Sequence, residues 1–248
     1  PLSRVQMSSR SCCLRVYRGG CSFGTGARPD SPCLNEGQNS EVFDSDKPLH
    51  ATAYVGISIP MSDPFFFGYG SLVNRSTHAY PRAAKATVTG WAREWKKSKL
   101  RRVAFLTAVE AHGEEIDGLI AAVPGADWMA LDERERAYHR LPVRDIRHDH
   151  PPLPDIQIYR ASADHIEETG DHVLLQSYLD VVVQGYLREF GAEGADRFFA
   201  TTHGWDMPIC QDRNDPVYPR HQRLTSEERD FVDDRLARLE VIFTDRRP

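Results

Sequence analysis

Short apolar runs alternate with polar and glycine-containing stretches between Pro64 and about residue 160. Runs of this length, bounded by turn-forming residues, are typical of strands. The first predicted strand begins at Pro64 and ends in a glycine-rich loop, and the others cover residues 86–91, 102–108, 118–123, 143–146 and 156–160. One helical pattern, at residues 128–138, interrupts this series of strands.

The last third of the chain has the helical period instead. Its first predicted helix ends at Gly191 and has apolar residues at Leu175, Tyr178, Leu179, Val182, Tyr186, Leu187 and Phe190. The second begins at Thr225, which can form a capping box with Glu228, and its apolar face contains Val232, Leu236, Leu239 and Phe243. Strands followed by helices indicate an α+β domain.

Composition adds limits on function. The chain has 248 residues, of which 40% are hydrophobic and 27% charged, an ordinary globular balance. Its net charge of -5 argues against nonspecific binding of nucleic acid. No apolar run approaches the ~20 residues that span a bilayer. We therefore expect a soluble protein with neither a membrane nor a nucleic acid as partner, and its oligomeric state stays open.

Residues 1–60 differ from the rest, because Ser, Gly, Pro and Arg dominate and apolar periodicity is weak. Such a segment is predicted to be disordered, which leaves residues 61–248 as the folded domain. Met61 lies three residues before the patterned part, so we expect it to be the natural start. The extension holds Cys12, Cys13, Cys21 and Cys33, and the single Cys210 of the domain fits a reducing cytoplasm.

The first candidate for chemistry is the loop that ends the first strand, Phe67-Gly68-Tyr69-Gly70-Ser71-Leu72. Glycine permits close approach to the backbone, and successive N–H groups can then converge on an anion or oxyanion. The alternative is a plain glycine turn at the end of a strand.

The second candidate is Glu135 in the predicted helix 128–138, with Asp127 available as its cap. Helical spacing places Glu135 on one face with Trp128, Leu131 and Tyr138. A carboxylate among apolar side chains loses hydration, which raises its pKa toward the range useful for acid/base catalysis. The alternative is a half-exposed glutamate paired with an arginine such as Arg134 or Arg136.

These segments together resemble the γ-glutamylcyclotransferase family, which includes ChaC-type and AIG2-like proteins. The resemblance covers roughly residues 64–186. It rests on the loop at 67–72 and on three further motifs in matching order, namely Gly90-Trp91-x-Arg93-x-Trp95, Gly118-Leu119-Ile120-Ala121 and Leu131-Asp132-x-Arg134-Glu135.

The resemblance implies a small mixed β-barrel flanked by helices, and an enzyme without a cofactor. The implied reaction is attack of the α-amine of a γ-glutamyl group on its own γ-carbonyl, which releases 5-oxoproline and an amino acid, peptide or amine. Glu135 would be the general acid/base, and Tyr69, Gly70, Ser71 and Leu72 would hold the substrate. Two tyrosines that contact substrate in some members match Tyr159 and Tyr178.

Two alternatives remain, one substrate is disfavoured and one mechanism is rejected. A noncatalytic small-ligand-binding module and a γ-glutamylamine cyclotransferase both remain. Glutathione is disfavoured as substrate, because Arg102-Val103-Ala104-Phe105 replaces a segment associated with ChaC-type members. A serine nucleophile at Ser71 is rejected, because the G-x-S-x-G pattern is incomplete.

No metal site is expected. The sequence lacks a Walker-type loop, an H-E-x-x-H motif and a cysteine pair with zinc spacing. His148 and His150 flank Asp149 in a segment followed by two prolines, which predicts an exposed loop.

The stretch 201–220 has no counterpart in the motifs above. It is rich in Trp, Tyr, Arg and Asp, and two interpretations are open. Arg213 or Arg220 would bind a carboxylate of the substrate's departing half, or Asp–Arg pairs would only fix the loop; we favour the second.

Overall fold

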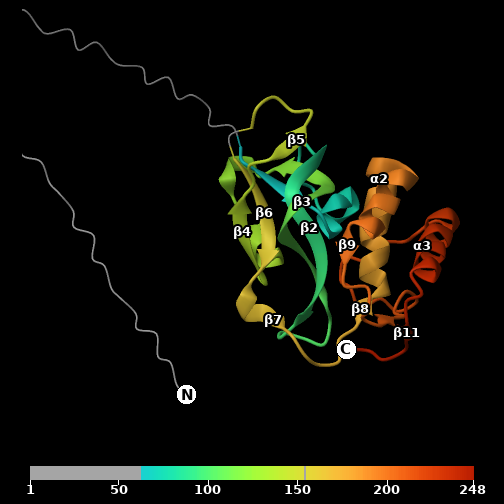
Figure 1. Ribbon diagram of the computed structural model, residues 1–248. Coiled ribbons are helices and arrows are strands. Elements are labelled where there is room, and N and C mark those ends of the chain that lie inside the picture. Colours follow the sequence, from blue (N-terminus) through green and yellow to red (C-terminus); the bar gives the residue numbers. More distant parts are fainter. Residues whose placement is uncertain (1–62, 154) are drawn as a thin grey trace, which may run out of the picture. The chain divides into compact units, whose positions relative to one another are not determined.

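A fully buried strand, β1 (Phe65–Gly68), lies inside the larger sheet of the computed structural model, which describes residues 63–153 and 155–248. It pairs antiparallel with β3 (Phe105–Ala122) and parallel with β6 (Ile156–Ala161). Its unbroken aromatic run suits a strand that is covered on both faces. The loop that follows β1 is therefore anchored in the middle of the sheet (Figure 1).

A long hairpin of β2 (Ala84–Ser98) and β3 forms most of this sheet. The sequence predicted three separate short strands here, at 86–91, 102–108 and 118–123, which is too short in each case. Glycines that look like strand ends are irregularities inside the strands instead. Gly90 has a φ of +84° where the register between β2 and β3 shifts, and Gly113 has a φ of +85°.

The larger sheet has the order β4-β6-β1-β3-β2-β5, with two short strands paired to β2 outside this path. Its remaining members are β4 (Tyr138–Pro142), β5 (Ile146–His148), β7 (Ile166–Glu167) and β9 (Thr202–His203). A small second sheet contains β8 (Leu174–Leu175), β10 (Ile209–Cys210) and β11 (Phe243–Thr244). The α+β class is confirmed. Within residues 63–153 and 155–248 the strand pairings do not close into a ring, so the barrel remains a prediction.

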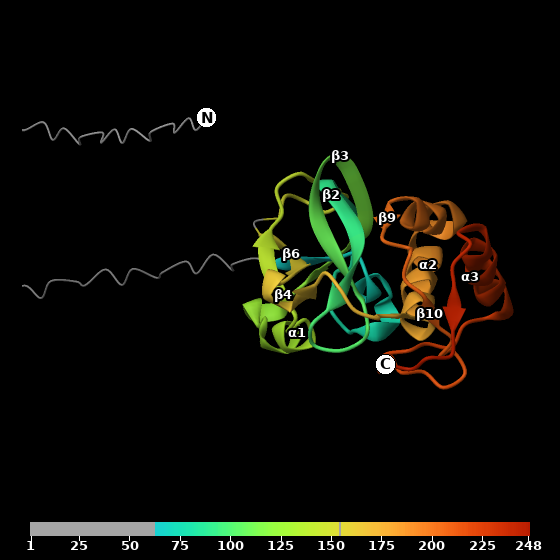
Figure 2. The ribbon, with the colours of Figure 1, turned by 60° about the horizontal axis from the view of Figure 1, so that its bottom comes forward.

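Two helices lie on one side of the larger sheet (Figures 1 and 2). They are α2 (Gln176–Ala200), which lies next to the sheet, and α3 (Ser226–Arg238), which lies beyond α2. The predicted end at Gly191 is a kink, because Gly191 has a φ of +70° and helical structure resumes after it. The capping box of Thr225 and Glu228 is confirmed.

Two details of the predicted pattern are wrong. Leu239 and Phe243 do not extend the apolar face of α3, because the helix ends at Arg238 and Phe243 belongs to β11. The predicted strand 143–146 falls on the connection between β4 and β5, and only Ile146 lies in a strand.

The predicted extension 1–60, its four cysteines and Met61 lie outside the described residues. Cys210 is a buried free thiol, and burial raises its pKa. No helix in the described part of the chain is long and apolar enough to cross a membrane.

Candidate functional site

The loop after β1 forms a tight turn. Residues Ser71–Val73 make one turn of 3-10 helix (η1), and a second turn (η2, Arg75–Thr77) follows. A Cβ on Gly68 would come within 2.5 Å of the Cβ of Leu72, and a Cβ on Gly70 within 2.7 Å of the Tyr178 hydroxyl oxygen. Glycine is therefore required for the turn at Gly68 and for the approach of Tyr178 at Gly70.

Glu135 lies at the end of a helix much shorter than predicted. Helix α1 (Met129–Arg134) has only six residues, and Tyr138 already belongs to β4, where it pairs with Ala161. Glu135 is the C-cap, and its N–H donates to the Leu131 carbonyl at 2.9 Å. The predicted helix 128–138 is thus wrong in its second half, because strand pairing replaces the helical hydrogen bonds after Glu135.

The predicted capping role of Asp127 agrees in part with the start of α1. The Asp127 carboxylate accepts a hydrogen bond from the Met129 N–H at 3.2 Å, although Trp128 is the formal N-cap.

Arg134 ties Glu135 to the loop after β1. Its Nε donates to Glu135 Oε1 at 3.1 Å, and its terminal nitrogens donate to Ser71 Oγ at 3.1 Å and to the Thr77 carbonyl at 3.0 Å. The Arg134 side chain is only 8% exposed and that of Glu135 17%. One guanidinium therefore fixes the distance between the carboxylate and the glycine-rich loop, which are more than sixty positions apart in the sequence.

The pKa of the Glu135 carboxyl group is shifted in the direction useful for acid/base chemistry. Burial raises its pKa, and the charges of Arg134 and Arg220 oppose that rise without cancelling it. Arg134 occupies only Oε1, and Oε2 accepts no hydrogen bond from the described residues. The second oxygen is consequently available to a ligand.

Glu135 stands where two cavities meet. The outer cavity has a volume of about 570 Å³, and a small inner hollow of about 30 Å³ lies beside the loop after β1. Both are lined by Ser71, Glu135, Tyr138 and Tyr178. A substrate in the outer cavity would therefore reach the carboxylate and the loop together.

The four loop residues predicted as substrate-binding, Tyr69, Gly70, Ser71 and Leu72, all line the inner hollow. The Tyr69 hydroxyl donates to the Tyr159 carbonyl at 2.6 Å, which fixes its ring against β6. Burial raises the pKa of Tyr69, so its phenol stays protonated.

The two predicted tyrosines differ. Tyr178, in the first turn of α2, lines both cavities, and burial raises its pKa well above the ordinary value. Tyr159 lines only the inner hollow, and its hydroxyl donates to Asp132 at 2.7 Å. The Tyr159 carbonyl accepts a hydrogen bond from Tyr69, and its hydroxyl donates one to Asp132, so both polar groups already have partners within the protein.

Sequence analysis missed Tyr138 and Arg134 as members of the site. The Tyr138 hydroxyl donates to the Leu106 carbonyl at 2.9 Å, and its ring lines both cavities. Both residues flank Glu135 closely in the sequence, but the helical spacing assumed for residues 128–138 gave them other roles.

The two arginines singled out in the stretch 201–220 have different environments. Arg213 forms ion pairs with Asp180 at 2.7 Å and Asp233 at 2.8 Å, which is the loop-fixing role. Arg220 lines the outer cavity. The prediction of a purely structural loop therefore holds for Arg213 and not for Arg220.

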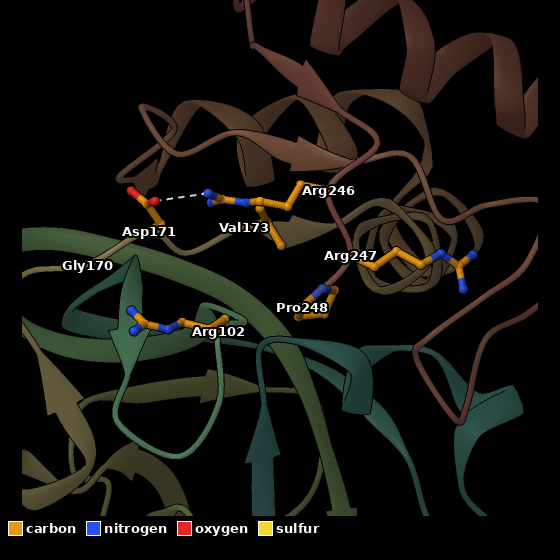
Figure 3. A pocket seen from close by; sticks show the side chains of 7 residues that line it. All are labelled: Arg102, Gly170, Asp171, Val173, Arg246, Arg247 and Pro248. Carbon is orange, nitrogen blue, oxygen red and sulfur yellow. Dashed lines mark hydrogen bonds and ion pairs between the residues drawn. The ribbon is translucent and has the colours of Figure 1, made fainter.

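A second large cavity, about 460 Å³, lies elsewhere and contains none of the predicted site residues. Figure 3 shows its basic lining of Arg102, Arg246 and Arg247, with Arg246 paired to Asp171 at 3.0 Å. The exposed loop predicted around His148 and His150 is wrong for His148, which ends β5, and both side chains are half-buried. Neither histidine lines the two cavities at Glu135, and within the described ranges no group of three or more His, Cys, Asp or Glu side chains is placed to hold a metal.

Comparison with known proteins gave matches only among solved structures. No family model and no curated protein matches the sequence. A structure named γ-glutamyl cyclotransferase has 16% identity and a TM-score of 0.45, and the match covers 69% of this chain and 99% of that one. The solved structures found include γ-glutamyl cyclotransferases.

Two further matches have the same range of similarity. A yeast γ-glutamyl cyclotransferase specific to glutathione has 11% identity and a TM-score of 0.38, with 69% of this chain and 95% of that one covered. YkqA from Bacillus subtilis has 15% identity and a TM-score of 0.46, with 57% and 56% covered. The γ-glutamyl cyclotransferases among these structures carry the name of the family that the motifs resemble.

Proposed function

We propose that this protein is a γ-glutamylcyclotransferase-like enzyme that converts a γ-glutamyl group to 5-oxoproline and releases an amino acid, peptide or amine. The observation that carries the proposal is the position of Glu135. It is a largely buried carboxylate with a raised pKa and one free oxygen, held beside a glycine-rich loop at the floor of a cavity.

The reaction needs one group that first accepts and later donates a proton. In the proposed sequence Glu135 takes a proton from the substrate's α-ammonium, and the freed amine attacks the γ-carbonyl carbon. Glu135 then donates that proton to the leaving nitrogen, the oxyanion re-forms the carbonyl and the C–N bond to the departing half breaks. The carboxylate finally takes the second proton from the ring nitrogen and passes it to the released amine, which leaves as an ammonium, so Glu135 ends ionised as it began. The proton balance closes on one residue, so no metal or nucleotide is needed.

The loop after β1 supplies the remaining requirements. The N–H groups at the start of a 3-10 turn have no partner inside that turn, so those of residues 70–72 can donate to the glutamyl group or to the oxyanion. Buried tyrosines with raised pKa values, Tyr69, Tyr138 and Tyr178, surround this place with neutral side chains. Such surroundings favour a folded, desolvated substrate and strengthen each polar contact.

The test is to quantify 5-oxoproline after incubation with γ-glutamyl dipeptides, glutathione and γ-glutamylamines, with the wild type and Glu135→Gln in parallel. We expect release by the wild type and a loss of about 10²- to 10⁴-fold in the variant, the usual contribution of a general acid/base. Glu110→Gln, at an exposed glutamate that lines neither cavity, is the matched control. Absence of release from every compound would favour a noncatalytic binding module.

We further propose a cytoplasmic location for this activity, because its single described cysteine is a buried free thiol.

A further inference from the structure

The outer cavity is lined in part by arginines that form no ion pair in the described part of the chain. Arg101 and Arg220 both line it, and neither forms an ion pair with a carboxylate among residues 63–153 and 155–248. Most other arginines on the surface of the domain are paired, for example Arg75 with Glu189 and Arg235 with Asp196.

The position of Arg220 is fixed by the loop that bears it. Asp212 is fully buried and accepts hydrogen bonds from the Ser177 N–H at 2.8 Å and the Val217 N–H at 2.9 Å. The Tyr218 N–H then donates to Ser177 Oγ at 3.2 Å. The loop is thereby attached to the first turn of α2, two residues before Arg220.

The side chain of Tyr218 continues this attachment into the cavity wall. It is 8% exposed, and its ring meets that of Tyr178 edge to face at 5.0 Å. Arg220 is half-buried, and its charge acts on the Glu135 carboxyl group. A half-buried arginine with a fixed backbone loses less conformational entropy when it binds an anion than one on a mobile surface loop does.

We infer that Arg220, which lines the outer cavity together with Arg101, binds a carboxylate on the departing half of the substrate. This inference rests on the proposed function and narrows it: the released group is an amino acid or peptide with a free carboxylate near the scissile bond, and not a simple amine. A guanidinium matches a carboxylate in shape and charge, whereas the aliphatic chain of a γ-glutamylamine would leave it desolvated and without a partner.

The experiment compares two substrates that differ only in that charge, γ-glutamylalanine and γ-glutamylalaninamide. Turnover is measured as 5-oxoproline release by the wild type, Arg220→Gln and Arg223→Gln. Binding is measured by calorimetry on the same proteins carrying Glu135→Gln. Arg223 is the matched control, because it is exposed, lies three residues away and lines neither cavity.

We expect the wild type to prefer the carboxylate over the amide by about 10- to 100-fold, the value of one charge-assisted hydrogen bond. Arg220→Gln should remove this preference by weakening only the carboxylate ligand, and Arg223→Gln should keep it. Equal turnover of both substrates, or an equal loss on both in Arg220→Gln, would overturn the inference and leave the proposed function intact. Binding that depends on Arg220 without any turnover would sink the proposed function and support the carboxylate site.

Discussion

Two buried carboxylate–arginine pairs in this protein have the same composition and different uses. Asp180 and Glu135 are both largely buried, burial raises the pKa of both carboxyl groups, and an arginine opposes the rise in each case. Arg213 contacts both oxygens of Asp180, at 2.7 and 2.8 Å, and also binds Asp233. Arg134 contacts a single oxygen of Glu135 at 3.1 Å.

The two pairs differ in the number of carboxylate oxygens that remain without a hydrogen bond. Asp180 is saturated and lines neither of the two cavities at Glu135, so its shifted pKa has no consequence for a ligand. Glu135 has one oxygen that accepts no hydrogen bond from the described residues, and this residue lines a cavity of about 570 Å³. A raised pKa alone therefore does not distinguish the carboxylate proposed as acid/base from a structural one; access and an unused oxygen do.

The largest effect is expected from breaking the saturated pair. Arg213→Gln leaves Asp180, whose side chain is 3% exposed, without its bidentate partner. Removing one member of a buried pair costs about 3–5 kcal/mol, so the melting temperature should fall by on the order of 10 °C.

The matched control is Arg147→Gln, which breaks an exposed pair with Glu115 and should change the melting temperature very little. Turnover per folded molecule and substrate preference should be unchanged in both variants. A fall in melting temperature no greater than that of the control would show that the Arg213–Asp180 pair does not stabilise the fold. A changed substrate preference would show that this pair is not independent of the site at Glu135.

A smaller effect, on chemistry, is expected from the open pair. Arg134→Gln removes the link between Glu135 and the loop after β1, so kcat should fall by about 10- to 100-fold through loss of positioning. It also removes a positive charge that lowers the pKa of Glu135. The acidic limb of the kcat/KM profile should consequently move to higher pH.

The shift of the pH profile separates positioning from general damage. Arg147→Gln serves again as control and should leave both kcat and the profile unchanged. A lower kcat with an unmoved acidic limb would mean that Arg134 does not act through the Glu135 carboxyl group.

The contrast between the pairs also shows what the sequence could predict. The loop 67–72 and Glu135 can be predicted as candidates, because both lie in local patterns, an aromatic run ending in glycines and a carboxylate between apolar residues, and because both match motifs of the family that the sequence resembles. The partners of Arg213 could not be found, because Asp180 is 33 positions away and α2 must first pack beside the loop. For the same reason Arg213 and Arg220 were equivalent candidates until the fold was known.

Two errors of secondary structure have a common physical origin. The helix predicted at 128–138 and the three short strands predicted in place of β2 and β3 both follow from local sequence patterns, which contain no information on pairing with distant strands. Tyr138 leaves the helix because Ala161 of β6 offers it a strand partner, and β2 continues through Gly90 because β3 pairs with it on both sides of the irregularity. Tertiary pairing overrides the local pattern in each case.

The smallest effect is a difference in stability between wild type and Glu135→Gln that depends on pH. The folded-state pKa of Glu135 is raised above its unfolded value, so its contribution to stability is complete below about pH 4, the ordinary range for glutamate, and is lost as pH rises through the folded pKa. A glutamine cannot lose a proton. The melting temperature of the variant minus that of the wild type should therefore increase with pH, by about 2–4 °C for each kcal/mol.

Thermal denaturation between pH 4 and pH 8 measures this difference, with exposed Glu110→Gln correcting for the loss of one negative charge. If the difference between variant and wild type stays constant or decreases as pH rises, Arg134 stabilises the Glu135 carboxylate more than burial disfavours it. In that case the two carboxylate–arginine pairs would be alike, and Glu135 would be a structural partner of Arg134 instead of a group held ready to exchange a proton.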